Sequence, residues 1–394
     1  MSDRGDLELA AAQPADAQSV APLASHFPVL DGLRGVAILL VLIHMLNLLG
    51  PMDGFAAHLS SHISSVGWTG VQLFFVLSGF LITGILLDTQ RATNYFSAFY
   101  MRRTLRIFPL YFGVLLAAFV VLPALGIVPA GIAADRKNQF WLWTYLENWA
   151  IIFDAGSTVF PHFWSLAVEE QFYLLWPLLI HTRSPRQCLR FCLYIAAAGL
   201  ALRFVLAWLG TPDGVIYQNS FCRMDALALG AAAAAAFRVP EYRQWIYGRH
   251  MHILAASILL TIVGTAVTRG FWNDTFVGET VGYTIVALIF VMLIIAAVGA
   301  EAVAASGWVT VLRWRPLRVL GKYSYAMYVF HKLLHDHMGK PLVAALDFNA
   351  AGSIWRNVAY VGTGVLVTFA VAFVSWHIYE KHFLRMKRFY AAKL

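Results

Sequence analysis

Long apolar stretches recur along the chain, separated by short polar segments rich in arginine. A helix of about 20 apolar residues crosses a hydrocarbon core roughly 30 Å thick, and it satisfies its own backbone hydrogen bonds there. We therefore predict an all-α integral membrane protein with about ten transmembrane helices around a central cavity. The predicted spans are 30–49, 67–88, 107–128, 164–182, 191–210, 222–237, 251–268, 281–300, 319–338 and 357–379.

The composition agrees with this pattern. Of the 394 residues, 60% are hydrophobic and 13% are charged, whereas about 25% of a typical soluble domain is charged. A soluble domain is therefore excluded. The three cysteines lie in or beside apolar segments without metal-ligand spacing, so we expect neither a disulfide framework nor a metal site.

The basic residues predict the orientation in the membrane. With the N-terminus in the cytoplasm, most of the 29 lysines and arginines fall on the cytoplasmic side, as the positive-inside rule requires. The apolar segment Phe140–Phe153 is short and contains Glu147 and Asn148, so we interpret it as interfacial or re-entrant. Both termini are then cytoplasmic. Because the basic residues form short clusters between apolar runs, we expect no binding of nucleic acid.

The two ends of the chain are polar. Residues 1–27 are rich in alanine and contain acidic residues, and they lack the features of a signal peptide, so we predict a disordered cytoplasmic tail. The membrane domain is predicted at 28–382, and residues 383–394 are predicted to form a basic cytoplasmic tail.

Ionisable residues inside the spans are candidates for function, because a charge at membrane depth costs a few kcal/mol or more. His44, Glu169 and His331 lie a few residues from the outer ends of their predicted spans, and Arg223 and Asp225 enter theirs near the outer face. A histidine beside a carboxylate can take a proton from a hydroxyl and then be stabilised as imidazolium. This pattern predicts acyl transfer by general-base catalysis.

Several of these residues also have a structural interpretation. His44 could be hydrogen-bonded between packed helices, and Glu170, about 100° round the helix from Glu169, is an alternative inward-facing carboxylate. Ser78 follows no nucleophile-elbow pattern, so helix packing is favoured over nucleophilic catalysis. His331 begins an HKLLH segment, which lacks the glutamate of a zinc protease motif, so we predict no metal.

A separate basic cluster lies on the cytoplasmic side. Arg103 and Arg106 are three residues apart on a helix that is predicted to enter the membrane at Pro109. Paired guanidinium groups suit phosphates, and the alternative is an anchor that contacts phosphates of membrane lipid. A phosphate site on one face and a histidine near the other require an extended donor. Coenzyme A, a nucleotide with a long pantetheine arm, has that shape.

Seven motifs follow one another along the chain between Leu30 and Glu380. They are Leu30-Asp-Gly-Leu-Arg34-Gly followed by His44, Gly70-Val-Gln-Leu-Phe-Phe-Val-Leu-Ser78-Gly-Phe-Leu-Ile-Thr83, Arg103-Thr-Leu-Arg106-Ile-Phe-Pro109, Trp164-Ser-Leu-Ala-Val-Glu169-Glu-Gln-Phe172-Tyr173, Arg223-Met-Asp225-Ala-Leu227, Tyr323-Ser-Tyr325 leading to His331, and Glu380. In this order they resemble the acyltransferase type 3 family of bacterial membrane proteins, which acylate cell-surface and secreted sugars.

The resemblance implies a role for each matching residue. It makes His44 the catalytic histidine, it assigns donor handling to Arg103 and Arg106, and it favours Glu169 over Glu170 as the catalytic carboxylate. We add Arg34 and Arg102 to the predicted acyl-CoA site. The residues predicted to contact substrate or line the cavity are Ser78, Trp164, Tyr173, Arg223, Asp225, Tyr325 and His331.

One spacing departs from the family. Ten residues usually separate the first-helix arginine from the histidine, whereas nine separate Arg34 from His44. Ten helical steps leave two side chains about 80° apart, whereas eleven return to within about 20° of the same face. The shorter spacing predicts either a bulge in the helix or an altered role for Arg34.

We therefore expect an O-acyltransferase of the bacterial inner membrane that moves an acyl group, acetyl by resemblance, from acyl-CoA to a hydroxyl of a cell-surface or secreted carbohydrate. His44 would deprotonate the hydroxyl or carry the acyl group itself, and Glu169 would orient the ring. The sequence shows no soluble extension of the kind some members carry, so we expect transfer within the membrane cavity. The alternatives are acylation of a small molecule or lipid-linked sugar, and a proton-coupled transporter, which would not consume the thioester.

Overall fold

The structure, a computed structural model, describes residues 27–46, 62, 65–272, 274–305, 307–339, 341 and 354–393. Within these ranges every regular element is a helix. The all-α prediction is therefore confirmed. Most of the predicted N-terminal tail, residues 1–26, lies outside the described residues.

Each of the predicted spans overlaps a long helix of the described chain, and the span 107–128 coincides over most of its length only when α4 is taken with the π turn Ala117–Val121 and α5 that continue it to Ala124. These helices are α1 (Pro28–Leu46), α3 (Thr69–Asp88), α4 (Tyr95–Leu116), α9 (Phe163–Ile180), α10 (Pro185–Trp208), α12 (Ser220–Ala236), α13 (Pro240–Val267), α14 (Tyr283–Ala302), α16 (Arg315–Leu334) and α18 (Ile354–Ser375). Seven helical segments of the described residues are long and apolar enough to cross a membrane. The other three helices are α9 and α16, which contain charged residues, and α12, which has 17 residues. A multi-pass membrane protein follows, while the count of ten crossings stays a prediction.

The segment between α5 (Leu122–Ala124) and α9 contains only short helices: α6 (Ala130–Asp135), α7 (Phe140–Trp143), α8 (Glu147–Ala150) and the 3₁₀ turn Ile151–Phe153. None has the length of a membrane crossing, in agreement with the interfacial interpretation. Glu147 is buried here, and its Oε1 accepts the backbone N–H of Ser157 at 2.5 Å. Burial raises the pKa of the Glu147 carboxyl to about 8, with a smaller contribution from Asp135.

Helices α3 and α12 cross at a point where neither backbone leaves room for a side chain. A Cβ atom on Gly79 would lie 1.9 Å from the carbonyl oxygen of Leu227, and one on Gly230 would lie 2.1 Å from that of Val76. Small residues of this kind allow helices to approach closely in membranes. The alanine-rich α12 can therefore pack against α3, which supplies one wall of the cavity described below.

Helices α10, α12 and α14 share a polar cluster in their common interface. Arg203 and Asp225 form an ion pair of 2.8 Å in which both side chains are fully buried. Thr284 donates a hydrogen bond of 2.8 Å to the same carboxylate, and Arg203 also donates to the carbonyl of Cys222. The Asp225 carboxylate is therefore satisfied between helices, and it does not line the cavity.

The C-terminal helix is longer than predicted. α18 continues through a π turn (Trp376–Glu380) into α19 (Lys381–Arg385) and a 3₁₀ helix (Met386–Tyr390), so the predicted tail at 383–394 is largely helical. The side chain of Asn94 donates to the Ala391 carbonyl at 2.9 Å and accepts the Lys393 backbone N–H at 2.8 Å. These bonds fix the C-terminal end against the start of α4.

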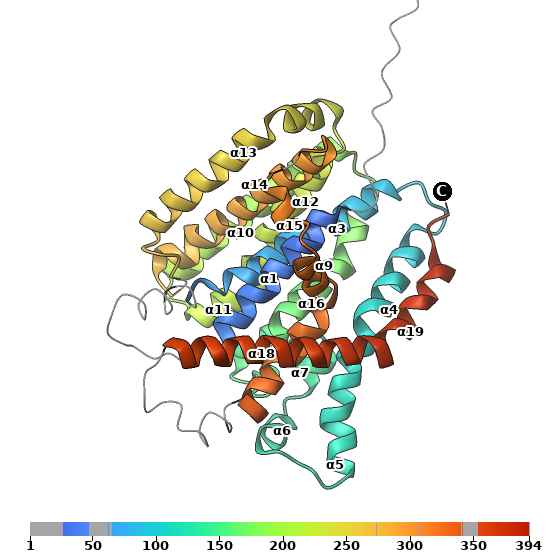
Figure 1. Cartoon of the computed structure of the whole chain (residues 1–394), viewed down its shortest axis with the longest axis vertical. Coiled ribbons are helices and arrows are strands. Elements are labelled where there is room, and N and C mark those ends of the chain that lie inside the picture. Colours follow the sequence, from blue (N-terminus) through green and yellow to red (C-terminus); the bar gives the residue numbers. More distant parts are fainter. Residues whose placement is uncertain are drawn as a thin grey trace, which may run out of the picture.

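The helices form three groups in space. Figure 1 shows α1, α3, α9 and α16 in the middle, α10, α12, α13 and α14 on one side, and α4 with α19 on the other, while α18 passes across the front. The central group and α4 supply every side chain that lines the main cavity.

Candidate active site

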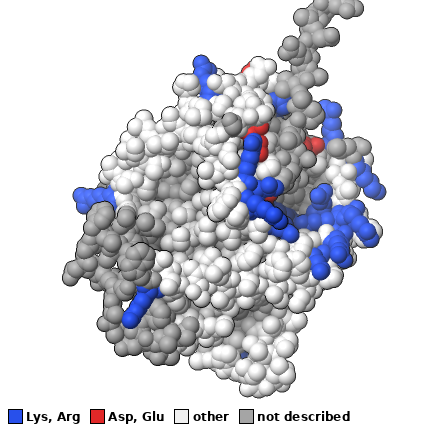
Figure 2. All heavy atoms as spheres, viewed as in Figure 1, with Lys and Arg blue, Asp and Glu red and all other residues white. Residues whose placement is uncertain are grey.

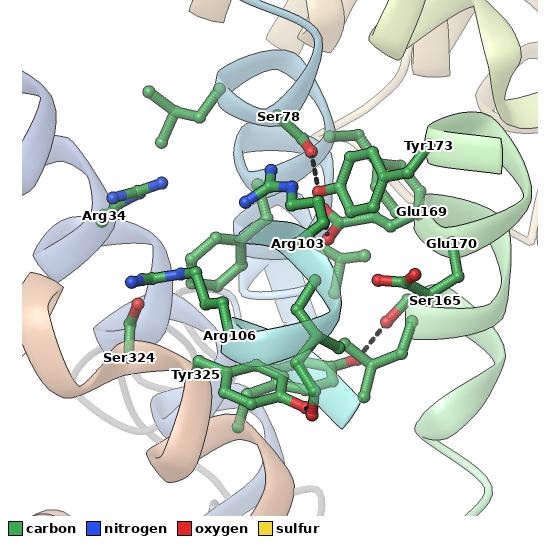
Figure 3. A pocket seen from close by; sticks show the side chains of 17 residues that line it. Arg34, Ser78, Arg103, Arg106, Ser165, Glu169, Glu170, Tyr173, Ser324 and Tyr325 are labelled. Atoms are coloured by element: carbon green, nitrogen blue, oxygen red, sulfur yellow. Dashed lines mark hydrogen bonds between the residues drawn. The ribbon is translucent and has the colours of Figure 1, made fainter. Parts of the chain in front are cut away.

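A cavity of about 790 Å³, counted with its open mouth, lies between α1, α3, α4, α9 and α16. Its wall is apolar in part, through residues such as Val71, Phe74 and Leu77. The polar residues that line it are Arg34, Ser78, Arg103, Arg106, Ser165, Glu169, Glu170, Tyr173, Ser324, Tyr325 and Tyr328. Figure 3 shows Arg34 and Arg106 on one side of this space and the carboxylates of α9 on the other.

Helix α9 presents one polar face to the cavity. Ser165, Glu169 and Tyr173 follow at intervals of four residues, which places them above one another on a helix. The Tyr173 hydroxyl donates to Glu169 Oε2 at 3.0 Å, and the Ser78 hydroxyl of α3 forms a short hydrogen bond to the Tyr173 oxygen. These bonds form a row from Ser78 through Tyr173 to Glu169, and Figure 3 marks the bond between Ser78 and Tyr173 with a dashed line. Glu170 also lines the cavity. Both carboxylates that the sequence offers as alternatives, Glu169 and Glu170, therefore face inward.

Basic groups face this row across the cavity. The Arg103 guanidinium carbon lies 4.3 Å from the centre of the Tyr173 ring, within the range of a cation–π interaction. Its buried Nε has no hydrogen-bond partner among the described residues. Arg34 is within electrostatic range of Arg103 and Glu169, and it lies 3.9 Å from Asp31. A cationic cavity wall with a free donor is suited to a substrate that carries or develops negative charge.

Two further cations lie near the basic side of the cavity without lining it. Lys387, from the C-terminal 3₁₀ helix, is within electrostatic range of Arg102, Arg103, Arg106 and Arg34. Arg102 is exposed and does not line the cavity. Figure 2 shows lysine and arginine gathered on the side of the molecule where Figure 1 places α4 and α19. Lys387 was predicted only as part of a basic tail, because the local sequence does not indicate which helix that segment contacts.

His44 does not line the cavity. Its side chain is exposed near the end of α1, whereas Arg34 on the same helix faces the cavity. α1 is a continuous helix from Pro28 to Leu46, so no bulge restores the face on which both side chains would point inward. Because ten helical steps leave the two side chains about 80° apart, Arg34 faces the cavity and His44 does not. His44 is therefore not among the residues that line this cavity with Glu169, and its catalytic role stays a prediction.

Arg223 and Trp164 lie in a separate aromatic cluster behind the cavity wall. The fully buried Arg223 guanidinium donates to Gln72 and lies 4.4 Å from the Tyr283 ring and 4.9 Å from the Tyr217 ring. Trp164 packs edge-on against Phe75, with ring centres 6.0 Å apart. Phe75 lines the cavity but neither Arg223 nor Trp164 does. Both residues support the wall from behind.

The remaining predicted residues lie on α16. Tyr325 lines the cavity, and its hydroxyl donates to the Ile107 carbonyl at 2.8 Å. His331 is buried outside the cavity beside His162, a residue that the sequence reasoning did not single out. Tyr328, also unpredicted, stands between this pair and the cavity. Among the described residues, no cluster of three or more histidine, cysteine or acidic side chains has the arrangement of a metal site.

Comparison with known proteins identifies relatives among bacterial O-acetyltransferases. The O-acetyltransferase OatA of Staphylococcus aureus is 28% identical over 325 residues, which cover 78% of this chain and 50% of that protein. The peptidoglycan O-acetyltransferase OatA of Listeria monocytogenes is 28% identical over 375 residues, which cover 90% of this chain and 55% of that protein. The chain thus spans about half the length of these curated relatives. No solved structure matches it.

The profile of the acyltransferase domain family matches residues 27–377. That range includes every residue that lines the cavity, from Arg34 on α1 to Tyr328 on α16. It also includes six of the seven sequence motifs, all but Glu380. The chain therefore belongs to this family, the acyltransferase type 3 family that its motifs resemble.

Proposed function

We propose that the protein is a membrane O-acetyltransferase that moves an acetyl group from acetyl-CoA to a hydroxyl of a cell-wall carbohydrate such as peptidoglycan. One observation carries the proposal: a single cavity combines the guanidinium groups of Arg34, Arg103 and Arg106 with the hydrogen-bonded row of Ser78, Tyr173 and Glu169. The names of the relatives support the acetyl group and the peptidoglycan acceptor.

The membrane orientation is part of the proposal. Ten crossings of the bacterial cytoplasmic membrane, with both termini inside, put the basic side of the cavity toward the cytoplasm. Acetyl-CoA is available there. The same orientation puts the start of α9 and the end of α16 near the outer face, where a cell-wall carbohydrate would arrive.

The basic side of the cavity suits the donor. Coenzyme A carries a pyrophosphate and a ribose phosphate, and arginine binds such groups through paired N–H donors. Arg102, Arg106 and Lys387 provide several cations around one region, which leaves Arg103 beside Tyr173 for the transfer step. The pantetheine arm would then extend along the apolar part of the wall, past Phe74, toward the carboxylates of α9.

The transfer step needs groups that position the thioester and stabilise charge. The acceptor hydroxyl loses its proton as its oxygen forms a bond to the thioester carbonyl carbon, the C–S bond breaks, and the sulfur takes up that proton to leave as the thiol of coenzyme A. Negative charge develops on the carbonyl oxygen, and the unpartnered N–H of Arg103 is a donor for it. The row through Tyr173 to Glu169 holds the reacting groups in place.

The role predicted for His44 stays a prediction, because its side chain is exposed and does not line this cavity. A His44→Ala variant tests it. Loss of transfer in a variant that enters the membrane normally would support His44 as the base, and full activity would overturn that role.

Reconstituted protein provides the test. Proteoliposomes would receive radiolabelled acetyl-CoA and peptidoglycan fragments, and the base-labile ester acetate on the fragments would be counted. Arg103→Gln should lower transfer by about 100-fold, the loss typical when one transition-state donor is removed. Arg186→Gln is the matched control, because Arg186 forms an exposed ion pair of 2.8 Å with Glu241. Wild-type protein that leaves the thioester intact in the presence of acceptor would disprove the proposal.

A further inference from the structure

A second, smaller cavity opens beside the main one. It has a volume of about 290 Å³, counted with its open mouth, and it lies between α4, α16, the π turn Trp376–Glu380 and α19. Arg106 and Tyr325 line both cavities, and Figure 3 shows these two side chains from within the main cavity. The two cavities are therefore neighbours that share a wall.

Two cations face the second cavity without a carboxylate partner. Lys322 and Arg106 both line it, and neither forms an ion pair with a carboxylate of the described residues. Lys322 is exposed, and its Nζ lies 3.9 Å from the centre of the Trp376 ring and 3.4 Å from the Tyr323 hydroxyl. These contacts position the ammonium group but do not neutralise it.

One carboxylate also lines the second cavity. Glu380 is 8% exposed, and its Oε1 accepts the Ser375 hydroxyl at 3.1 Å. It lies within electrostatic range of Arg106, so it balances at most one of the two positive charges. The cavity is therefore cationic on balance, with an ammonium group and a guanidinium group both facing it. Such a pair of donors suits a phosphate group.

The second cavity lies on the path that the donor would follow. The proposed orientation puts the start of α16 in the cytoplasm, and Lys322 lies in the first half of that helix. Tyr325 follows one turn later, where its hydroxyl donates to the Ile107 carbonyl beside the main cavity. A donor that enters from the cytoplasm would therefore pass Lys322 before it reaches the main cavity.

We propose that the second cavity binds a phosphate group of the acyl-CoA donor between Lys322 and Arg106, an inference that rests on the proposed function. A phosphate held at the shared wall leaves the pantetheine arm free to extend past Tyr325 into the main cavity, toward Glu169. Lys322 then determines donor specificity, because it distinguishes a phosphorylated thioester from one without phosphate. It takes no part in the transfer step itself.

Substitution of Lys322 tests the proposal in the full-length protein reconstituted in proteoliposomes. Lys322→Gln removes the charge and Lys322→Arg keeps it. Arg385→Gln is the matched control, because Arg385 is an exposed cation of α19 that lines neither cavity. Acetyl transfer to peptidoglycan fragments would be measured with acetyl-CoA and with S-acetylpantetheine, which has the same thioester arm but no phosphate. Vesicles of phosphatidylcholine, with and without added phosphatidylglycerol, separate a donor phosphate from a lipid phosphate.

We expect Lys322→Gln to raise the KM for acetyl-CoA about tenfold at unchanged kcat, because it removes one charge-assisted contact that is made throughout the reaction. The kcat/KM for S-acetylpantetheine should not change. Lys322→Arg and Arg385→Gln should stay close to the wild type with both donors and in both kinds of vesicle.

An unchanged KM for acetyl-CoA in Lys322→Gln, or an equal loss with both donors, would show that the second cavity binds no donor phosphate, while the proposed function stands. A loss confined to vesicles that contain phosphatidylglycerol would assign the cavity to a lipid and would also overturn the inference. If the wild-type protein itself transfers no acetyl group from acetyl-CoA, the proposed function has failed, and the inference fails with it.

Discussion

Removal of one hydroxyl, that of Tyr173, is the most informative perturbation of the cavity. Tyr173→Phe eliminates the bonds to Ser78 and to Glu169 Oε2. It preserves the aromatic ring that lies 4.3 Å beneath the Arg103 guanidinium. The substitution therefore separates hydrogen bonding from ring packing.

The expected loss can be worked out from these bonds. A hydrogen bond to a charged group contributes about 1.5–3 kcal/mol, and a neutral one contributes about 0.5–1.5 kcal/mol. Together they amount to roughly 2–4.5 kcal/mol. If the row positions Glu169 for the transfer step, the rate should fall by about 30-fold to 2000-fold, since 1.36 kcal/mol is tenfold.

The assay is acetyl transfer from acetyl-CoA to peptidoglycan fragments in proteoliposomes. Tyr100→Phe is the matched control, because its hydroxyl makes one bond of 2.8 Å to the Leu174 carbonyl away from the cavity. Tyr173→Leu additionally removes the ring beneath Arg103 and should be slower still. Wild-type activity in Tyr173→Phe would refute the view that this row organises the reaction.

Three further predictions follow from the charges and the packing. Arg106→Gln should raise the KM for acetyl-CoA more than it lowers kcat, because it would remove the proposed phosphate contact, which persists through the reaction; an unchanged KM at low salt would argue against a donor site there. The Glu147 carboxyl has a pKa of about 8 in the fold and 4.5 otherwise, so its contribution is fully present below pH 4.5 and is lost as pH rises toward 8. The free energy of unfolding of the wild type should fall across that window, relative to Glu147→Gln, by up to a few kcal/mol, and its thermal midpoint should fall with it. If the midpoints of the two proteins change with pH in parallel, the carboxyl is not shielded. Gly230→Ala should destabilise the fold by about 1–3 kcal/mol, since the added Cβ would lie 2.1 Å from the Val76 carbonyl oxygen; an unchanged melting temperature would mean that α3 and α12 are not in close contact.

Local periodicity was sufficient to predict part of the cavity. Glu169 and Tyr173 lie one helical turn apart in a span where charge is costly, so the sequence could indicate that both face inward. Arg103 and Arg106 could be placed on one face by the same spacing. In each case the informative residues are neighbours on one helix.

Contacts between segments that are distant in the sequence could not be predicted from local periodicity. Lys387 comes within electrostatic range of the cavity arginines because the C-terminal helix packs beside α4. Asp225 is withdrawn from the cavity by Arg203, on a different helix. His162 precedes the span that was predicted at 164–182, so its pairing with His331 could not be inferred from depth. The spacing between Arg34 and His44 is one residue shorter than in the family, which turns His44 away from the face of Arg34. That effect depends on α1 remaining a regular helix.

The Arg203–Asp225 pair constrains how the protein enters the membrane during synthesis. A lone charge inside a membrane span costs a few kcal/mol or more, whereas the two side chains together are neutral and fully enclosed. Only the short helix Asp213–Gln218 and its flanking residues separate α10 from α12. We therefore expect the translocon to release these two helices as one hairpin, with the ion pair already formed before α13 emerges from the ribosome.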